Sequence, residues 1–313
     1  MRRLTLLTNP EKCNLHCPLC FLNQRNGAER VADDDCREFA VGEMPFETAR
    51  AAIEKYAAER DASGRRLLRE VIPSTMGEPL LYSHFDELLE LCRTMELPLN
   101  LTTNGTFLGK WGDDAGMETL LRACSDIKVS YLASEQFDGW KSNVEKLLNV
   151  RKSLMAWDAV QAGNVASGAA AKSMPSARTL GVATVSLQVT LHKKNLNDAP
   201  SLVKWASAIG IDRIKWNPVV LLNAASHKLR EDFALEEALL NSLCKELRTG
   251  TLSTSKIKHE GSLFFNNRVD YCAVGGTCDA CLFADEVWIW PDGHEDHCPN
   301  PERRWGEQLL SAK

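Results

Sequence analysis

Three cysteines near the start of the chain have a spacing suited to metal chemistry. The stretch K-C-N-L-H-C-P-L-C-F places Cys13, Cys17 and Cys20 within eight positions, after the apolar run at residues 4–8. His16 could complete a Cys₃His zinc site, because structural zinc takes four ligands. However, His16 directly precedes Cys17, and adjacent residues seldom both reach one tetrahedral ion. A four-iron cluster instead accepts one ligand at each iron. Three cysteines then leave one iron open to a small molecule.

A second group of cysteines lies near the other end of the sequence. Cys272, Cys278, Cys281 and Cys298 frame the stretch E-V-W-I-W-P-D-G. Four cysteines around a hairpin suit a Cys₄ zinc ribbon or a fully ligated four-iron cluster, and His294 and His297 add donors that zinc accepts. A Cys272 that did not ligate could donate a hydrogen atom. The scattered Cys36, Cys92, Cys124 and Cys244 are expected to be small buried hydrophobic residues.

Composition restricts the class of protein that these cysteines serve. The chain has 313 residues, of which 44% are hydrophobic and 25% charged, and its formal net charge is −5. The sequence has no run of Lys and Arg that would predict a nucleic-acid surface. No segment approaches the ~18 apolar residues of a membrane span. The eleven cysteines are not expected to form a disulfide framework in a reducing cytosol. We therefore expect a cytoplasmic protein with no nucleic-acid partner and no membrane association.

The elements that position the cysteines follow from alternating hydrophobic patterns. Strand-like runs alternate with segments of helical periodicity, which predicts repeated βα units around a parallel sheet. The predicted strands are 4–8, 68–74, 99–103, 127–131, 182–191 and 213–220, and the predicted helices are 46–60, 84–96, 117–124, 140–157, 199–209 and 235–247. The Ala-, Gly- and Ser-rich stretch 160–178 is predicted to be a loop. A hairpin is expected to turn at Asp292-Gly293.

These elements predict an α/β fold with two regions. Six strands are too few for a closed eight-stranded barrel and suit an open, partial (β/α)6 TIM-like barrel, with a doubly wound sheet as the alternative. Residues 1–225 would form this core. Residues 226–313 would form a small C-terminal subdomain that binds a cluster through the second group of cysteines.

C-x3-C-x2-C after a first strand resembles the signature of the radical S-adenosylmethionine (radical SAM) superfamily. The resemblance implies that Cys13, Cys17 and Cys20 hold a [4Fe-4S] cluster whose open iron is chelated by the amino and carboxylate groups of SAM. Reduction then cleaves SAM to methionine and a 5′-deoxyadenosyl radical. Leu19 stands where the superfamily usually has an aromatic residue, and Phe21 follows the third cysteine.

The stretch M-G-E-P after the second strand is similar to the superfamily's G-G-E-P motif, which binds the methionine amino group. Gly77 would allow a close approach of the backbone, Glu78 would offer a carboxylate to an ammonium group, and Pro79 would stiffen the turn. Met76 replaces the first Gly of the motif.

Further SAM contacts are implied on later strands. Asn104 belongs to T-T-N-G-T, which looks like the superfamily's T-N-G after its third strand. Ser130 ends the fourth strand, where the superfamily often has a polar contact to SAM. Gln188 and Thr190 lie on one face of the fifth strand and are candidates for contacting the ribose.

The C-terminal cysteines and E-V-W-I-W-P-D-G resemble the auxiliary iron–sulfur extensions called SPASM or twitch domains, which implies an auxiliary [4Fe-4S] cluster. The resemblance predicts a radical SAM enzyme of oxidoreductase or epimerase type, served by an external flavodoxin- or ferredoxin-type electron donor. A small molecule of sugar or cyclitol type is the expected substrate, and a ribosomally synthesised peptide is the alternative. The non-enzymatic alternative is a zinc-binding scaffold.

Overall fold

The structure is a computed structural model of the whole chain. It describes residues 2–15, 17, 19–20, 42–73, 76–132, 139–166, 181–219, 231–250, 252, 256–264 and 286–296.

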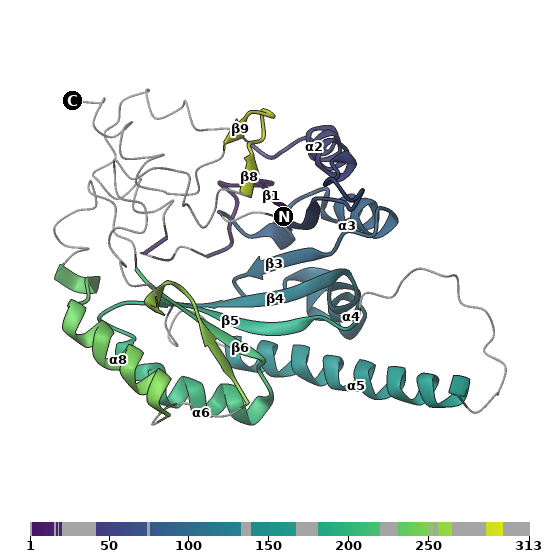
Figure 1. Cartoon of the computed structure of the whole chain (residues 1–313). Helices are drawn as coiled ribbons and strands as arrows, with labels where there is room; N and C mark the ends of the chain where they lie inside the picture. The colour runs from purple at the N-terminus through teal and green to yellow at the C-terminus, as the bar shows by residue number, and fades with distance from the viewer. Residues whose placement is uncertain are drawn as a thin grey trace, which may run out of the picture.

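A mostly parallel sheet organises these residues (Figure 1). Its strands are β1 (Arg2–Leu6), β2 (Leu68–Pro73), β3 (Leu99–Thr103), β4 (Cys124–Tyr131), β5 (Thr184–Leu191), β6 (Arg213–Pro218), β7 (Lys258–Glu260), β8 (Glu286–Ile289) and β9 (Glu295–Asp296). Their order in the sheet is β7-β6-β5-β4-β3-β2-β1-β8-β9. Among the described strands, only the β8–β9 pair is antiparallel.

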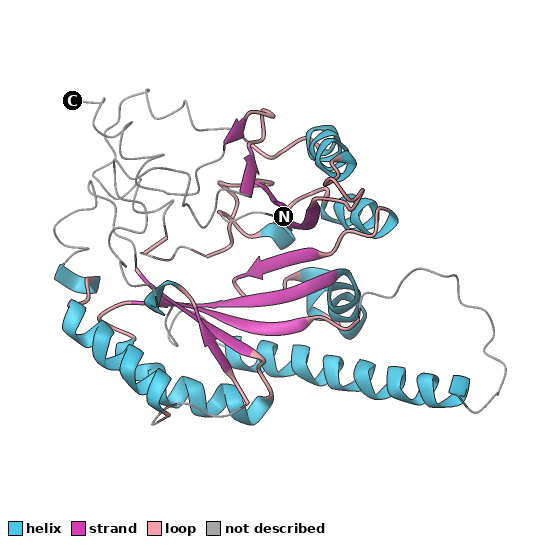
Figure 2. Cartoon of the chain, viewed as in Figure 1, coloured by secondary structure: helices cyan, strands magenta, loops and turns pink. Residues whose placement is uncertain are grey.

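Helices follow most of the strands and pack on one side of the sheet (Figure 2). They are α2 (Phe46–Ala58), α3 (Phe85–Thr94), α4 (Asp114–Ala123), α5 (Trp140–Ala166), α6 (Ala199–Ile209) and α8 (Glu237–Thr249). The helices pack against the sheet through an apolar face. In α6, for example, the three- and four-residue spacing of Leu202, Val203 and Ala206 puts them on one buried face. Buried residues of all these helices and of strands β1 to β6 and β8 belong to one apolar core.

The two faces of the sheet differ in polarity. Strand β5 reads T-V-S-L-Q-V-T-L, and its apolar residues Val185, Leu187, Val189 and Leu191 are at most 1% exposed within the helix-covered core. Side chains alternate between faces along a strand, so the four polar residues of β5 point to the opposite face. Parallel sheets are usually apolar on both faces. The polar second face therefore requires a separate explanation.

The strand order confirms the predicted fold class. Strands β1 to β6 are neighbours in chain order, whereas a doubly wound sheet reverses its order at a switch point. The α/β fold with an open, partial-barrel sheet is thus confirmed. Among the described helices, none is both long and apolar enough to cross a membrane.

Several boundaries differ from the sequence prediction. Helix α5 continues to Ala166, so residues 160–166 are helical and not part of the predicted loop, whose remainder (167–178) lies outside the described residues. Cys124 begins β4 instead of ending the preceding helix.

The C-terminal hairpin is confirmed, but its place in the sheet was not predicted. Trp288 pairs with Asp296 and Ile289 with Glu295, and Gly293 in the turn has a φ of +89°. Strand β8 also runs parallel to β1, and β7 runs parallel to β6. Residues beyond 225 therefore add strands to both sides of the sheet, while the proposed boundary at 225/226 stays a prediction.

Candidate active site

The cysteine loop follows β1 at the carboxyl end of the sheet. The Leu7 amide donates to Ile289 O of β8 at 2.9 Å, which extends the sheet pairing one residue beyond β1. Cys13, Cys17 and Cys20 are all half-buried, and the Cys20 amide donates to Cys17 O at 2.9 Å. His16 lies outside the described residues.

The thiol of Cys13 accepts two N–H donors. The Leu15 amide lies 3.4 Å from Cys13 Sγ, and Asn104 Nδ2 lies 3.7 Å from it. Burial raises the pKa of the Cys13 thiol, and these two donors oppose that rise. Metal ligation requires the thiolate, and N–H donors stabilise its negative charge. Cys13 is therefore partly prepared for ligation by its surroundings.

The donor set of the cysteine loop fits an iron–sulfur cluster. Within the described part of the chain, no three His, Cys, Asp or Glu side chains are close enough to hold a single metal ion. A four-iron cluster does not need three side chains that converge on one metal ion, because each thiolate binds a different iron. Half-buried thiols on one loop, with N–H donors at a sulfur, suit such a cluster.

Gly77 brings the G-E-P turn against the beginning of the cysteine loop. Its φ is +74°, and a Cβ at this position would lie 2.1 Å from Asn9 O and 2.8 Å from Lys12 O. Two hydrogen bonds hold the two segments together. The Glu78 amide donates to Lys12 O at 2.9 Å, and Asn9 Nδ2 donates to Glu78 O at 2.6 Å. Only glycine fits this close approach of two backbones.

The carboxylate of Glu78 connects the G-E-P turn to the end of β3. It is 2% exposed, and it accepts hydrogen bonds from Thr103 Oγ1 at 2.7 Å, the Asn104 amide at 2.7 Å and the Leu80 amide at 3.3 Å. Burial raises the pKa of Glu78 to about 7 against the opposing effect of these donors. Its predicted contact with the SAM ammonium group stays a prediction.

Asn104 joins the T-N-G turn to the cysteine loop. Its Nδ2 donates to Asn14 Oδ1 at 2.9 Å as well as facing Cys13 Sγ. Its Oδ1 accepts from the Thr106 amide at 2.9 Å and from Thr106 Oγ1 at 2.7 Å, and Asn14 Nδ2 donates to Thr106 Oγ1 at 3.1 Å. The amide group is thereby held in one orientation.

The other two residues of M-G-E-P, Met76 and Pro79, contribute to apolar packing and to a turn. Met76 packs with Leu7 and Trp290 in a small apolar cluster, and Pro79 opens a 3₁₀ turn, η2 (Pro79–Leu81). Trp290 belongs to the C-terminal hairpin, so this cluster joins the hairpin to the base of the cysteine loop.

Ser130 and Gln188, predicted as SAM contacts, are neighbours in the sheet. Ser130 pairs with Gln188, and Gln188 pairs with Lys215 of β6. Two residues further along β5, Thr190 pairs with Asn217 of β6. All of these residues belong to the polar face and are half-buried. Their binding of SAM stays a prediction.

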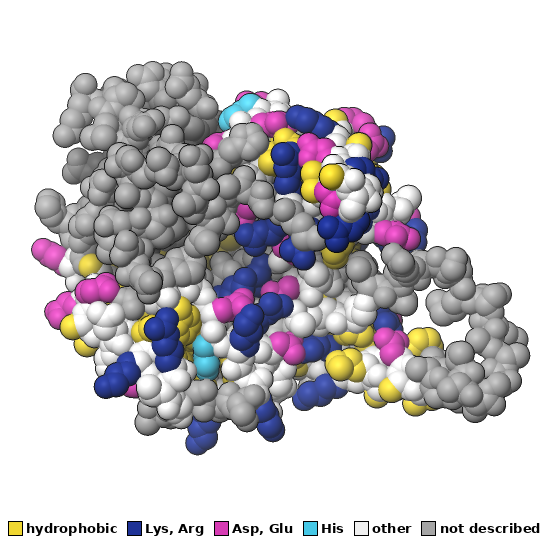
Figure 3. Space-filling view, viewed as in Figure 1, with side chains coloured by type: hydrophobic (Ala, Val, Ile, Leu, Met, Phe, Trp, Pro, Cys, Tyr) yellow, Lys and Arg dark blue, Asp and Glu magenta, His cyan; other side chains and the backbone are white. Residues whose placement is uncertain are grey.

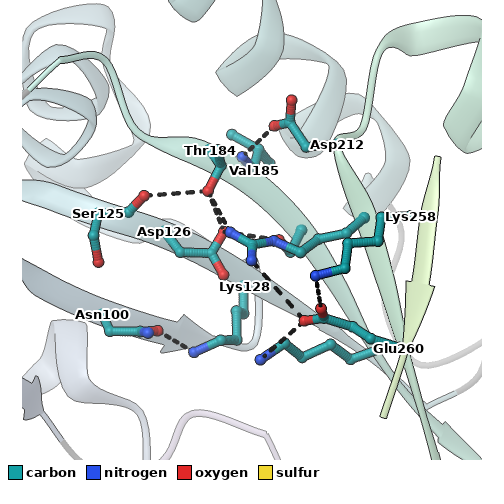
Figure 4. A network of polar contacts seen from close by, with 12 residues as sticks. Asn100, Ser125, Asp126, Lys128, Thr184, Val185, Asp212, Lys258 and Glu260 are labelled. Carbon is teal, nitrogen blue, oxygen red and sulfur yellow. Dashed lines mark hydrogen bonds and ion pairs between the residues drawn. The ribbon is translucent and has the colours of Figure 1, made fainter. Parts of the chain in front are cut away.

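A network of charged and polar side chains covers the same face of the sheet nearer the amino ends of the strands, before Ser130 on β4 and Gln188 on β5 (Figure 4). We call it the polar floor, and it comprises Asn100 of β3, Asp126 and Lys128 of β4, Thr184 and Ser186 of β5, Arg213 and Lys215 of β6, and Lys258 and Glu260 of β7. Sequence reasoning missed it, although the alternation D-I-K-V-S in β4 and R-I-K in β6 contained the signal.

The four C-terminal cysteines, Cys272, Cys278, Cys281 and Cys298, lie outside the described residues, as does Cys36. Their predicted ligation of an auxiliary cluster therefore stays a prediction. Cys92, Cys124 and Cys244 are buried, as expected of small hydrophobic residues.

Comparison with known proteins bears on the fold. No family model and no curated protein matches the sequence. Among solved structures, Streptococcus suis SuiB bound to the precursor peptide SuiA matches with a TM-score of 0.55 and 14% identity over 95% of this chain and 59% of SuiB. SuiB bound to S-adenosylmethionine matches with a TM-score of 0.57, 13% identity, and 95% and 60% coverage. Native anSMEcpe with bound AdoMet matches with a TM-score of 0.59, 15% identity, and 95% and 74% coverage.

The chain has the radical SAM fold. The fold implied by the cysteine motif is thus confirmed. In this fold the cysteine loop, the G-E-P turn and the T-N-G turn meet at one end of the sheet, and hydrogen bonds join each of them to another. The chain spans about three-fifths of the length of the SuiB chains that it matches.

Proposed function

We propose that the chain is a radical SAM enzyme. The observation that carries the proposal is the cysteine loop, held by the G-E-P turn and Asn104 at the carboxyl end of a radical SAM sheet. Cys13, Cys17 and Cys20 would hold the [4Fe-4S] cluster. A reduced cluster with bound SAM supplies a 5′-deoxyadenosyl radical, which abstracts hydrogen from a substrate C–H bond.

The protein's own residues prepare this site. The Leu15 amide and the Asn104 side chain donate to Cys13 Sγ, which favours the thiolate. Glu78, through Thr103 and Asn104, fixes the end of β3 relative to the cysteine loop. The proposed SAM contacts remain Met76, Gly77, Glu78, Pro79, Asn104, Ser130 and Gln188.

A peptide is the substrate class with the better support. SuiB was solved with the precursor peptide SuiA, and anSMEcpe with AdoMet and the Cp18Cys peptide, the latter at a TM-score of 0.54 and 15% identity. The sugar or cyclitol expected first from the sequence has no such counterpart among these structures. Oxidation or epimerisation of the peptide, an auxiliary cluster on Cys272, Cys278, Cys281 and Cys298, and a flavodoxin- or ferredoxin-type donor complete the proposal.

Anaerobic reconstitution with iron and sulfide tests this function. The protein should turn brown, absorb near about 400 nm, and form 5′-deoxyadenosine from SAM when reduced with dithionite. Alanine at Cys13, Cys17 or Cys20 should abolish 5′-deoxyadenosine formation, whereas Cys244→Ala, at a buried cysteine of α8, should retain it. Colourless protein with stoichiometric zinc and no 5′-deoxyadenosine would instead support the zinc scaffold.

A further inference from the structure

The polar floor carries more positive than negative charge. Its four cations are Lys128, Arg213, Lys215 and Lys258, and its two carboxylates are Asp126 and Glu260. Two positive charges are in excess within this set, and Arg3, Glu70 and Glu286, which also act on Lys128, reduce the excess to one, whereas the whole chain has a net charge of −5. In the space-filling view, Lys and Arg side chains lie in the middle of the molecule with Asp and Glu side chains among them (Figure 3).

Both carboxylates of the polar floor are already engaged. Glu260 lies 3.0 Å from Lys258 Nζ, 3.4 Å from Lys215 Nζ and 4.0 Å from Arg213 Nη1. Asp126 lies 3.4 Å from Arg213 Nη2, and its Oδ1 also accepts hydrogen bonds from the hydroxyl groups of β5. Among the described residues, neither carboxylate has an oxygen within 4.0 Å of a further Lys or Arg nitrogen.

Lys128 is the cation that this network leaves without a counter-ion. It is 6% exposed, its Nζ donates to Asn100 Oδ1, and within the described residues no carboxylate oxygen lies within 4.0 Å of it. An ammonium group has three donors, so two have no hydrogen-bond partner in the part of the chain that the structure describes. A buried ammonium without an ion pair is costly.

The charged groups around Lys128 come from several strands. Arg3 of β1 and Lys215 of β6 repel its charge, and Glu70 of β2, Asp126 of β4 and Glu286 of β8 attract it. Burial has the largest effect on the pKa of Lys128. Together with these attracting and repelling charges, it lowers that pKa to about 8. An anion bound beside Lys128 would offset that loss of charge.

The position of Lys128 relates it to the proposed SAM site. It lies two residues before Ser130 on the same face of β4, which corresponds to about 7 Å along the strand. Lys215 is in register with Gln188, and Lys128 with Ser186. The two lysines thus flank β5, with their Cα atoms on strands about 10 Å apart. Of the two β5 residues between them, Ser186 is fully buried and Gln188 is half-buried, so a small anion would bind beside Gln188, within the length of both lysine side chains.

We propose that Lys128 and Lys215 bind a carboxylate of the substrate, beneath the row formed by Ser130 and Gln188. The inference rests on the proposed function in one respect, which is that the carboxylate belongs to the molecule that is modified. It specifies the substrate as an acidic one, and a peptide substrate as one that carries an Asp, a Glu or a free C-terminus. Anchored at this depth, the substrate extends toward the SAM end of the sheet.

The test uses the full chain, reconstituted with its cluster and labelled with ¹³C at the lysine ε-carbons. Glutarate is the probe, and the neutral glutaramide is its matched control at constant ionic strength. The NMR signal of Lys128, assigned with Lys128→Met, should show a higher titration midpoint in glutarate and the same midpoint in glutaramide. Lys215→Met should weaken glutarate binding about tenfold or more, as expected for loss of a charged hydrogen bond. Lys152→Met, at an exposed position on α5, should not weaken it.

The source of the carboxylate is resolved by a second probe, the capped peptide acetyl-Gly-Glu-Gly-amide. Tighter binding of the peptide than of glutarate assigns the site to a peptide substrate, and the reverse assigns it to a small acid. A Lys128 midpoint that neither probe moves would overturn the inference, as would equal weakening by Lys152→Met and Lys215→Met. The binding assay needs no SAM cleavage. Glutarate binding without 5′-deoxyadenosine formation would therefore overturn the proposed function alone.

Discussion

At the scale of single residues, Asn104 and Glu78 link the segments that surround the proposed cluster. The sequence indicated that both residues belong to the site, because each lies in a short motif that follows a strand. Their partners could not be predicted, since Cys13 is 91 residues from Asn104 and Thr103 is 25 residues from Glu78 in the chain. Contacts of this kind depend on which strands are neighbours, and local patterns do not contain that information.

The Asn104 side chain should raise the reduction potential of the proposed cluster. An N–H donor to a ligand sulfur stabilises the more negative, reduced state. Asn104→Leu keeps the volume and removes the donor, so the midpoint potential should fall, measured by potentiometric titration followed by EPR. Asn149→Leu, at an exposed position on α5, is the control. Equal midpoint potentials in the wild type and in Asn104→Leu would contradict the role.

Lys128 should make the protein less stable at neutral pH than it is in alkali. Its folded pKa of about 8 lies below its ordinary value of 10.5, so between these values the unfolded chain binds more protons. The free energy of unfolding should then rise with pH across this window. Lys128→Met should remove that rise and add about 1–3 kcal/mol at pH 7, measured by urea unfolding from pH 7 to 10.5. A lower stability of Lys128→Met at pH 7, with an unchanged pH slope, would refute the argument.

At the scale of elements, the G-E-P turn depends on close contact with the cysteine loop. Gly77→Ala should cost about 3 kcal/mol or more of unfolding free energy, because backbone oxygens block the new Cβ. Gly64→Ala is the matched control. Gly64 has a φ of +80°, and nothing lies within 4 Å of the position that a Cβ would take there, so it should lose only about 1–2 kcal/mol from backbone strain. Similar losses for the two variants in urea unfolding would show that the contact does not matter.

The elements differ in how far the sequence determined them. Strands β1 to β6 and the helices between them were predictable from local periodicity. Helix α5 was predicted too short because Ala- and Gly-rich composition suggested a loop, although Ala favours helix. The hairpin at Asp292-Gly293 was predicted from its turn, but the pairing of β8 with β1 was not. That pairing joins segments more than 280 residues apart.

At the scale of the whole molecule, the C-terminal hairpin and the cysteine loop belong to one edge of the sheet. Strand β8 lies between β1 and β9, and Glu295 binds Lys55 Nζ at 2.5 Å and Tyr56 OH at 2.8 Å on α2. Cys298 follows β9 by two residues. The strand that precedes Cys298, the last of the proposed auxiliary ligands, is thus anchored beside the segment that begins the cysteine loop.

Removal of iron should leave most of this architecture intact. The apolar core joins strands β1 to β6 and β8 to the six described helices without using the cysteine loop, unlike small metal domains that unfold without their ion. Treatment of the reconstituted protein with an iron chelator should abolish absorbance near about 400 nm, while the far-ultraviolet circular dichroism and a single cooperative thermal transition persist. The triple variant with alanine at Cys13, Cys17 and Cys20 should show the same circular dichroism. Loss of helical signal in both samples would mean that the cluster, and not the core, holds the sheet together.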